Sequence, residues 1–261
     1  MFLDCHFYSD VLGKCCSMYA IVPQKVNTQI GLDSAGGRER YPVLYLLHGL
    51  SDDHTIWLRR TSIERYAADK QLVIIMPNGD RSFYTDMAHG GRYWTFLSEE
   101  LPAIVAATLP VSTRREDTFA AGLSMGGYGA LKLALRRPDR FAAAGAMSAV
   151  TDMGDFLRRM REGGSETEAL GFFGSWEVPA EDDIYQLAEK TAALPEAERP
   201  KIFHACGTED YLYQTNIAFR DFMRRLGAFD YTYTEGPGIH NWAFWDQHLQ
   251  EILAWLPLAK D

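Results

Sequence analysis

A serine flanked by glycines is the first feature of this sequence that could do chemistry. Ser124 lies at the centre of GLSMG, residues 122–126, between an apolar run at 118–121 and a helix-like run at 127–136. A GxSxG pattern in this context is typical of a sharp strand-to-helix turn that leaves the serine hydroxyl exposed. Ser124 is therefore a candidate nucleophile, and the backbone N–H of Met125 is a candidate oxyanion donor. A glycine-rich turn that only helps a helix to pack is the structural alternative.

A serine hydroxyl is a weak nucleophile near neutral pH, so Ser124 needs a base and a carboxylate that orients this base. In enzymes that use this motif, the order along the chain is serine, acid, histidine. His240 follows the strand-like residues 229–234 through a turn-rich segment, residues 235–238, and is the candidate base. The other histidines are less well placed, because they precede Ser124 or lie inside expected strands or helices: His6, His48, His54, His89, His204 and His248.

The orienting acid is expected after a late strand. Asp210 follows the strand-like residues 202–206 through a short loop and is the favoured candidate. Glu209 is its direct rival, and Asp152, after the preceding strand, is a more distant one. Adjacent residues on an extended loop point in different directions, so only one of Glu209 and Asp210 can meet the imidazole. Solvated loop charges are the structural alternative for this acidic pair.

A second oxyanion donor is expected in the loop after an early strand. His48, Gly49 and Leu50 follow the continuous apolar run at residues 43–47. Gly49 would allow the backbone to approach the reacting atoms closely, and the N–H of Leu50 is the candidate donor. The sequence thus predicts an oxyanion hole formed by Leu50 and Met125.

Apolar runs and helix-like stretches alternate along the chain. The expected strands are residues 2–8, 17–22, 43–47, 72–76, 117–121, 142–148, 202–206 and 229–234, and the expected helices are residues 62–70, 94–109, 127–136, 215–226 and 242–255. This order predicts a single α/β domain over residues 1–261 with a doubly wound, mostly parallel sheet. The first two strands are expected to form an antiparallel edge.

The alternation stops at residues 151–199, which contain glycine pairs, aromatic residues and many acidic residues. A structureless loop of this length is unusual in a compact domain, so we expect a cap-like insertion with short helices of its own over the active site. A surface decoration is the alternative. Trp57, Trp176 and Trp242 are candidate substrate-binding residues near the expected mouth of the site, although aromatic residues in such places are often core residues.

Composition argues against several classes of partner. The formal net charge is −9, and the 26 Lys and Arg residues are scattered, which does not favour a nucleic-acid surface. No run approaches the roughly 18 apolar residues of a membrane span, and no secretory signal is recognisable. Asp52, Asp53 and His54 are expected to cap a helix rather than to bind a metal, because no matching ligand cluster occurs elsewhere. No metal or cofactor is expected.

Cysteine usage bears on the compartment. The four cysteines form neither a disulfide framework nor a CxxC metal pattern. Reduced thiols in the cytoplasm fit this pattern best.

Together these motifs resemble a known family, the esterase group of α/β-hydrolases that includes esterase D, S-formylglutathione hydrolase and bacterial tributyrin esterases. The resemblance covers nearly the whole chain and depends on residues 41–50, 76–78, 84–86, 122–130, 206–210 and 240–242. It implies an α/β-hydrolase fold with Ser124, Asp210 and His240 as the catalytic triad.

Within this family, residues 57–60 and 84–86 look most like the tributyrin-esterase branch. That branch implies a serine carboxylesterase acting on short acyl or aryl esters, including acetylated or feruloylated carbohydrates. Family likeness also suggests a homo-oligomer. A thioesterase acting on S-formylglutathione, an acyltransferase and a ligand-binding protein without catalysis remain as alternatives.

Overall fold

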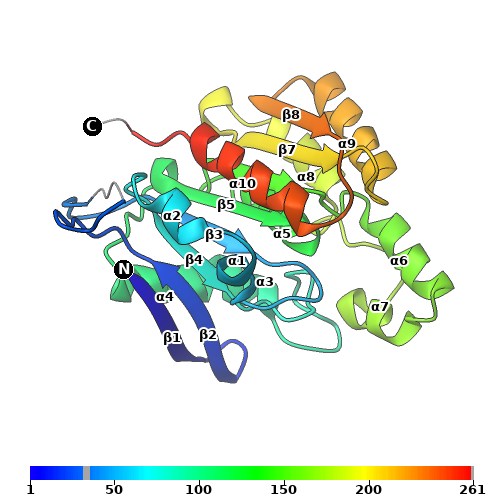
Figure 1. Cartoon of the computed structure of the whole chain (residues 1–261). Coiled ribbons are helices and arrows are strands. Elements are labelled where there is room, and N and C mark those ends of the chain that lie inside the picture. The colour runs from blue at the N-terminus through cyan, green and yellow to red at the C-terminus, as the bar shows by residue number, and fades with distance from the viewer. Residues whose placement is uncertain (32–35, 260–261) are drawn as a thin grey trace.

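A mixed eight-stranded sheet forms the centre of the computed structural model, which describes residues 1–31 and 36–259. The strand order is β1-β2-β4-β3-β5-β6-β7-β8 (Figure 1). The strands are β1 (Phe2–Ser9), β2 (Lys14–Ile21), β3 (Val43–Leu47), β4 (Val73–Pro77), β5 (Thr118–Leu123), β6 (Ala143–Met147), β7 (Lys201–Gly207) and β8 (Tyr231–Gly236). β1 pairs antiparallel with β2 at one edge of the sheet, and β2 pairs antiparallel with β4. The other six strands, from β4 through β3 and β5 to β8, run parallel to one another. The predicted mostly parallel α/β sheet with an antiparallel edge is confirmed.

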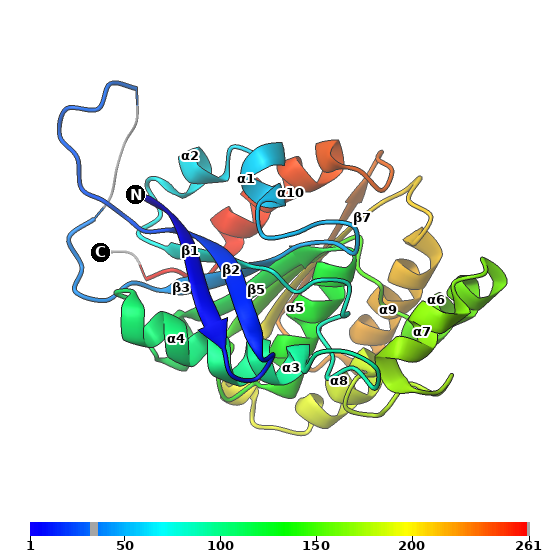
Figure 2. The ribbon, with the colours of Figure 1, turned by 90° about the horizontal axis from the view of Figure 1, so that it is seen from below.

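Helices cover both faces of this sheet. One face carries α1 (Ile56–Arg60), α2 (Ile63–Ala67) and α10 (Trp242–Trp255), and the other carries α4 (Leu101–Thr108), α5 (Met125–Arg136), α8 (Ile184–Ala192) and α9 (Tyr213–Leu226) (Figure 2). Strand β3 shows why both faces are covered: Val43, Tyr45 and Leu47 are buried in one core cluster, while Leu44 and Leu46 are buried in the other. Because both faces of this strand are buried, its side chains are shielded from solvent, and all five residues are therefore apolar or aromatic.

Two helical stretches differ from the prediction. The helix expected at residues 62–70 is present but short, as α2 over Ile63–Ala67, and the preceding short helix α1 was not predicted. The expected helix 94–109 begins as α3 (Tyr93–Thr95) and passes through a π-helical turn at Phe96–Glu100 before α4. Such turns are local irregularities that the spacing of apolar residues along the sequence does not reveal.

The segment at residues 151–199 contains the expected short helices, α6 (Met153–Glu162) and α7 (Glu166–Phe173), followed by α8 and a 3-10 turn at Glu196–Glu198. α6 and α7 contact each other and protrude at the end of the sheet where the parallel strands terminate (Figure 1). α8 instead packs against α5 and α9, as a crossover helix between β6 and β7. The segment is thus only partly an insertion, because its last third belongs to the layer that covers the sheet.

Within residues 1–31 and 36–259, no helix combines the length and the apolar character needed to cross a bilayer. All four cysteines, Cys5, Cys15, Cys16 and Cys206, have free thiols.

Candidate active site

Ser124 occupies a strained turn between β5 and α5. Its backbone angles are φ 55° and ψ −117°, a conformation that residues with a side chain rarely adopt. Its N–H donates to the carbonyl oxygen of Met147 on β6 at 2.9 Å, which holds the turn against the sheet. A Cβ on Gly122 would lie 2.4 Å from the Gly126 oxygen, and one on Gly126 would lie 2.3 Å from the Leu47 oxygen. The bend therefore needs glycine at both positions.

Asp210 and His240 are hydrogen-bonded to each other. The Nδ1 of His240 lies 2.8 Å from Oδ2 and 3.1 Å from Oδ1 of Asp210. Asp210 is fully buried at its side chain, and its Oδ1 also accepts the N–H of Leu212 at 2.8 Å. Because a carboxylate only accepts hydrogen bonds, the proton of the neutral imidazole lies on Nδ1. Nε2 of His240 is then the atom that can accept a proton.

The two rival acids have other partners. The Glu209 carboxylate accepts the backbone N–H of Gly238 at 2.5 Å and so ties the loop after β7 to the loop that carries His240. Asp152 is the N-cap of α6, where it accepts the N–H of Asp155 at 2.8 Å. Of the three carboxylates considered from the sequence, the structure therefore brings Asp210 to the imidazole.

Ser124 and this pair lie at the same end of the sheet. The strands β5, β7 and β8 are parallel, and each of the three residues follows the carboxyl end of its strand. Ser148, which follows β6 between them, accepts a hydrogen bond of 3.1 Å from Nε1 of Trp245. The ring of Trp245 in turn packs edge-on against His240, with centroids 4.9 Å apart. The serine and the Asp210–His240 pair thus share one packed neighbourhood.

The loop after β3 reaches Ser124 from the other side. A Cβ on Gly49 would lie 3.8 Å from the Cβ of Ser124, so this backbone passes directly beside the serine. His48 is completely buried beneath the loop: its Nδ1 lies 2.7 Å from the Gly49 oxygen, and its Nε2 accepts the N–H of Gly79 at 2.9 Å. Burial lowers the pKa of His48, so the ring is neutral and donates from Nδ1. His48 is a residue whose role the sequence did not indicate.

A buried polar cluster supports this loop from below. The hydroxyl of Tyr84 donates to the His48 carbonyl at 2.9 Å, and the Tyr84 carbonyl accepts from Nζ of Lys132 at 2.9 Å. Lys132 is fully buried on α5 and lies 2.5 Å from Oδ1 of Asp182. Burial lowers the pKa of Lys132 to about 8 despite this carboxylate. The cluster links helix α5, the segment before α8 and the loop at Gly49.

The three tryptophans predicted to bind substrate differ in their surroundings. Trp57 is completely buried, and its Nε1 donates to the Leu47 carbonyl at 3.1 Å, so it is a core residue rather than a surface of the site. Trp242 is partly exposed and packs edge-on against Trp57 at 5.1 Å. Trp176 is partly exposed and lies under the guanidinium of Arg161, 4.9 Å from its ring centroid.

An aromatic residue that the sequence did not single out packs directly against His240. The ring of Tyr211 is 4.6 Å from the His240 ring, centroid to centroid, and the residue is 58% exposed. Its position directly after Asp210 is the signal that could have found it.

The expected helix cap is not formed by Asp52, Asp53 or His54, because the N-cap of α1 is Thr55. Asp53 instead stabilises the turn before the helix, where its Oδ1 accepts the N–H of Thr55 at 2.9 Å and its hydroxyl at 2.6 Å. In the part of the chain that the structure describes, no cluster of three or more His, Cys, Asp or Glu side chains could hold a metal ion.

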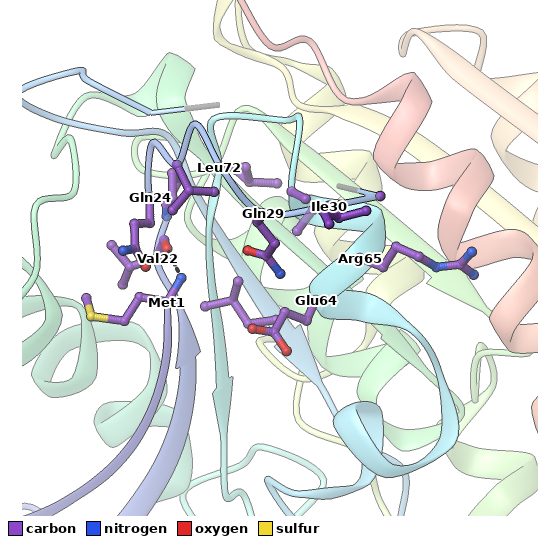
Figure 3. Close-up of a pocket in the computed structure, with 14 residues that line it drawn as sticks. Met1, Val22, Gln24, Gln29, Ile30, Glu64, Arg65 and Leu72 are labelled. Carbon is purple, nitrogen blue, oxygen red and sulfur yellow. Dashed lines mark hydrogen bonds between the residues drawn. The ribbon is translucent and has the colours of Figure 1, made fainter. Parts of the chain in front are cut away.

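A cavity of about 400 Å³ lies between the N-terminus and α2, where Met1 donates to the Val22 carbonyl at 2.7 Å (Figure 3). Leu72, at the amino end of β4, lines this cavity. The cavity therefore lies at the amino ends of the parallel strands, whereas Ser124 lies at their carboxyl ends.

Comparison with known proteins agrees with this geometry. Residues 21–256 match the family described as "Putative esterase". The acetyl esterase of Caldicellulosiruptor saccharolyticus is 29% identical and is aligned over 99% of both chains. Among solved structures, the fluorophosphonate-binding serine hydrolase F of Staphylococcus aureus is 36% identical with a TM-score of 0.85 and 98% coverage of each chain. An S-formylglutathione hydrolase of the same species is 36% identical with a TM-score of 0.82 and 98% coverage of each chain.

The sheet topology and the serine at its strand-to-helix turn define an α/β-hydrolase-fold protein of the serine hydrolase class. The chain belongs to the esterase family and is an enzyme that acts on ester bonds. The family and the fold predicted from the sequence are confirmed. The alternative of a ligand-binding protein without catalysis loses its support.

Proposed function

We propose that this esterase hydrolyses short acyl and aryl esters through an acyl-enzyme formed on Ser124, with Asp210 and His240 as the other members of the triad. The hydrogen bond of 2.8 Å between Asp210 and His240 carries this proposal, because it leaves Nε2 of the imidazole free to accept a proton at the carboxyl ends of the parallel strands, where Ser124 also lies. Leu50 and Met125 supply the backbone N–H groups of the oxyanion hole.

The reaction proceeds in two acyl-transfer steps. His240 accepts the Ser124 proton as the hydroxyl oxygen attacks the ester carbonyl, and the oxyanion is stabilised by the N–H groups of Leu50 and Met125. The imidazolium then gives its proton to the alcohol oxygen as the carbon–oxygen bond breaks. Water repeats the attack on the acyl-enzyme with His240 as base, and Ser124 is released with the carboxylic acid.

The substrate range remains part of the proposal. Acetyl esters are favoured by the likeness to an acetyl esterase, and butyryl, feruloyl and acetylated carbohydrate esters extend the same chemistry. A thioesterase acting on S-formylglutathione is the second candidate, favoured by the 36% identity to an S-formylglutathione hydrolase. Comparing kcat/KM for acetyl, butyryl and feruloyl esters and S-formylglutathione separates these candidates.

Substitution Ser124→Ala tests the nucleophile. We expect turnover of p-nitrophenyl acetate to fall by about 10⁴-fold or more, with an unchanged circular dichroism spectrum. Ser175→Ala, in an exposed turn, is the matched control and should retain full activity. A slow ester should add one acyl group to the wild-type protein at Ser124, as measured by mass spectrometry of its peptides. Retained turnover in Ser124→Ala would disprove the assignment.

We also propose a cytoplasmic location and a homo-oligomeric state. Free thiols at all four cysteines are compatible with a reducing compartment. Cell fractionation tests the location, and light scattering of the purified protein tests the oligomeric state.

A further inference from the structure

Two exposed apolar side chains flank the loops that carry Asp210 and His240. Among the described residues, the large apolar side chains that are well exposed are Met1, Tyr8, Ile30, Tyr211 and Ile239. Tyr211 directly follows Asp210, and Ile239 directly precedes His240. Single exposed apolar residues are common on protein surfaces. Here, however, two of them lie next to Asp210 and His240, the orienting acid and the base of the proposed triad.

The two ring neighbours of His240 differ in their access to a ligand. Trp245 packs edge-on at 4.9 Å and is 6% exposed, so it supports the imidazole from the interior. Tyr211 packs at 4.6 Å with an angle of 50° between the rings, and more than half of its surface is free. Of these two rings, only Tyr211 has apolar surface available to a substrate.

The loops that carry this surface are fixed to each other. The N–H of Thr208 donates to the Gly236 carbonyl at 2.9 Å, and the N–H of Glu209 donates to the Gly238 carbonyl at 3.1 Å. The carbonyl of Tyr211 also accepts from Nη1 of Arg159 on α6 at 3.3 Å. A surface held in this way loses little freedom on binding, so its contacts can contribute to affinity.

The chemistry of ester cleavage identifies which half of the substrate lies here. Nε2 of His240 must come within hydrogen-bond distance, about 3 Å, of the alcohol oxygen in order to protonate it. The carbon chain of the alcohol starts at that oxygen and therefore passes over the surface beside the imidazole. The acyl half points instead toward Ser124 and the oxyanion hole.

We infer that Tyr211 and Ile239 form the binding surface for the alcohol half of the ester and select substrates with aromatic or extended apolar alcohols. This inference depends on the proposed triad. The same surface holds an acceptor alcohol when one replaces water. In that step the alcohol gives its proton to Nε2, its oxygen bonds to the acyl carbon, and the bond from that carbon to Ser124 Oγ breaks as Nε2 returns the proton to Oγ.

The test compares ethyl acetate with 2-phenylethyl acetate, which form the same acetyl-enzyme and release alcohols of similar acidity. We expect Tyr211→Ala to lower kcat/KM for 2-phenylethyl acetate by about fivefold to tenfold, the size of an aromatic contact, and to change ethyl acetate less than twofold. Tyr211→Phe should retain the preference, because it keeps the ring. Ile239→Ala should shift the same ratio in the same direction by a smaller factor.

Transfer of the acetyl group provides a second measurement. At equal concentrations of 2-phenylethanol and ethanol, the wild-type acetyl-enzyme should form more 2-phenylethyl acetate than ethyl acetate, and Tyr211→Ala should reduce this excess by the same fivefold to tenfold. Hydrolysis of the acetyl-enzyme by water should keep its rate, since the alcohol has already left.

Tyr8→Ala is the matched control, because Tyr8 is 59% exposed and lies on β1, at the opposite edge of the sheet from β8. It should leave both esters unchanged. An equal loss of kcat/KM for both esters in Tyr211→Ala would show that Tyr211 only orients the imidazole, and no loss for either ester would show that the alcohol lies elsewhere. Either result overturns the inference and leaves the triad intact, since Ser124→Ala tests the triad separately.

Discussion

The Nδ1 atom of His48 lies 2.7 Å from the carbonyl oxygen of Gly49, the residue that follows it in the chain. This carbonyl belongs to the same peptide plane as the N–H of Leu50, and in a trans peptide the two groups point in opposite directions. The hydrogen bond to Gly49 therefore also sets the direction of the Leu50 N–H. His48 is a positioning residue for the proposed oxyanion hole.

Substitution His48→Ala should lower kcat because the Leu50 N–H loses its fixed direction. Loss of one oxyanion donor typically costs about 10²- to 10³-fold in kcat, so a loss of about 10²-fold is expected, with KM changed only a few-fold. Steady-state kinetics on p-nitrophenyl acetate measures both constants. Because burial lowers the pKa of His48, the shape of the pH–rate profile should not change.

His6→Ala is the control for His48→Ala, since His6 is exposed on β1. It should leave kcat unchanged. A folded His48→Ala protein with normal kcat would contradict the positioning role.

Gly126→Ala should destabilise the fold. The added Cβ would lie 2.3 Å from the Leu47 oxygen and 2.7 Å from the His48 oxygen, both of which are main-chain atoms. Overpacking of this kind costs about 1–3 kcal/mol, and we expect the upper part of that range because backbone must move. Urea denaturation measures the loss. Gly154→Ala on α6 is the control, since its nearest neighbour is 3.4 Å away, and equal stabilities of the two variants would refute the steric argument.

Asp182→Asn should leave the buried Lys132 ammonium without a counter-ion. Removing one partner of a buried pair costs about 3–5 kcal/mol of unfolding free energy. Asp230→Asn is the control, because Lys201 and Asp230 form an exposed pair at 2.8 Å whose loss should cost less than about 1 kcal/mol. Denaturant titrations of both variants measure the two losses of unfolding free energy. Similar losses in the two would mean that Asp182 does not stabilise the buried charge.

Acid should weaken the fold through His204. This ring is buried between Asn216 and Tyr231, each 2.7 Å away, and burial lowers its pKa from 6.5 to about 4. Between these two values the unfolded chain binds more protons, so stability falls as the pH falls through this window. The full shift corresponds to about 3 kcal/mol.

His204→Gln tests this pH dependence. The variant should show a shallower loss of unfolding free energy between pH 6.5 and pH 4 than the wild type, measured by urea titration at each pH. Parallel curves would mean that other groups cause the acid sensitivity.

Features encoded locally could be predicted from the sequence. The apolar run of β3 requires two covered faces, and the glycines around Ser124 require a tight bend, so both were visible without a structure. The order of the elements also gave the edge of the sheet to which Asp210 and His240 belong.

Features that depend on side-chain direction could not be predicted in the same way. Glu209 and Asp210 are adjacent carboxylates, and only the paired loops show that Glu209 meets Gly238 while Asp210 meets the imidazole. The sequence predicted that Trp57 lines the entrance of the active site, but this residue lies in the core, and its position there depends on long-range packing. The contact of Tyr211 with His240 likewise depends on how two distant loops meet.

The hydrogen bonds between the loop at Thr208 and Glu209 and the loop at Gly236 and Gly238 have a wider consequence. They join the acid and the base into one unit whose alignment comes mainly from contacts between these two loops, while α6 adds the bond from Arg159 to the Tyr211 carbonyl. Exposed side chains of α6 and α7 other than Arg159 can therefore change, and substrate choice with them, without breaking the contacts that align the acid and the base.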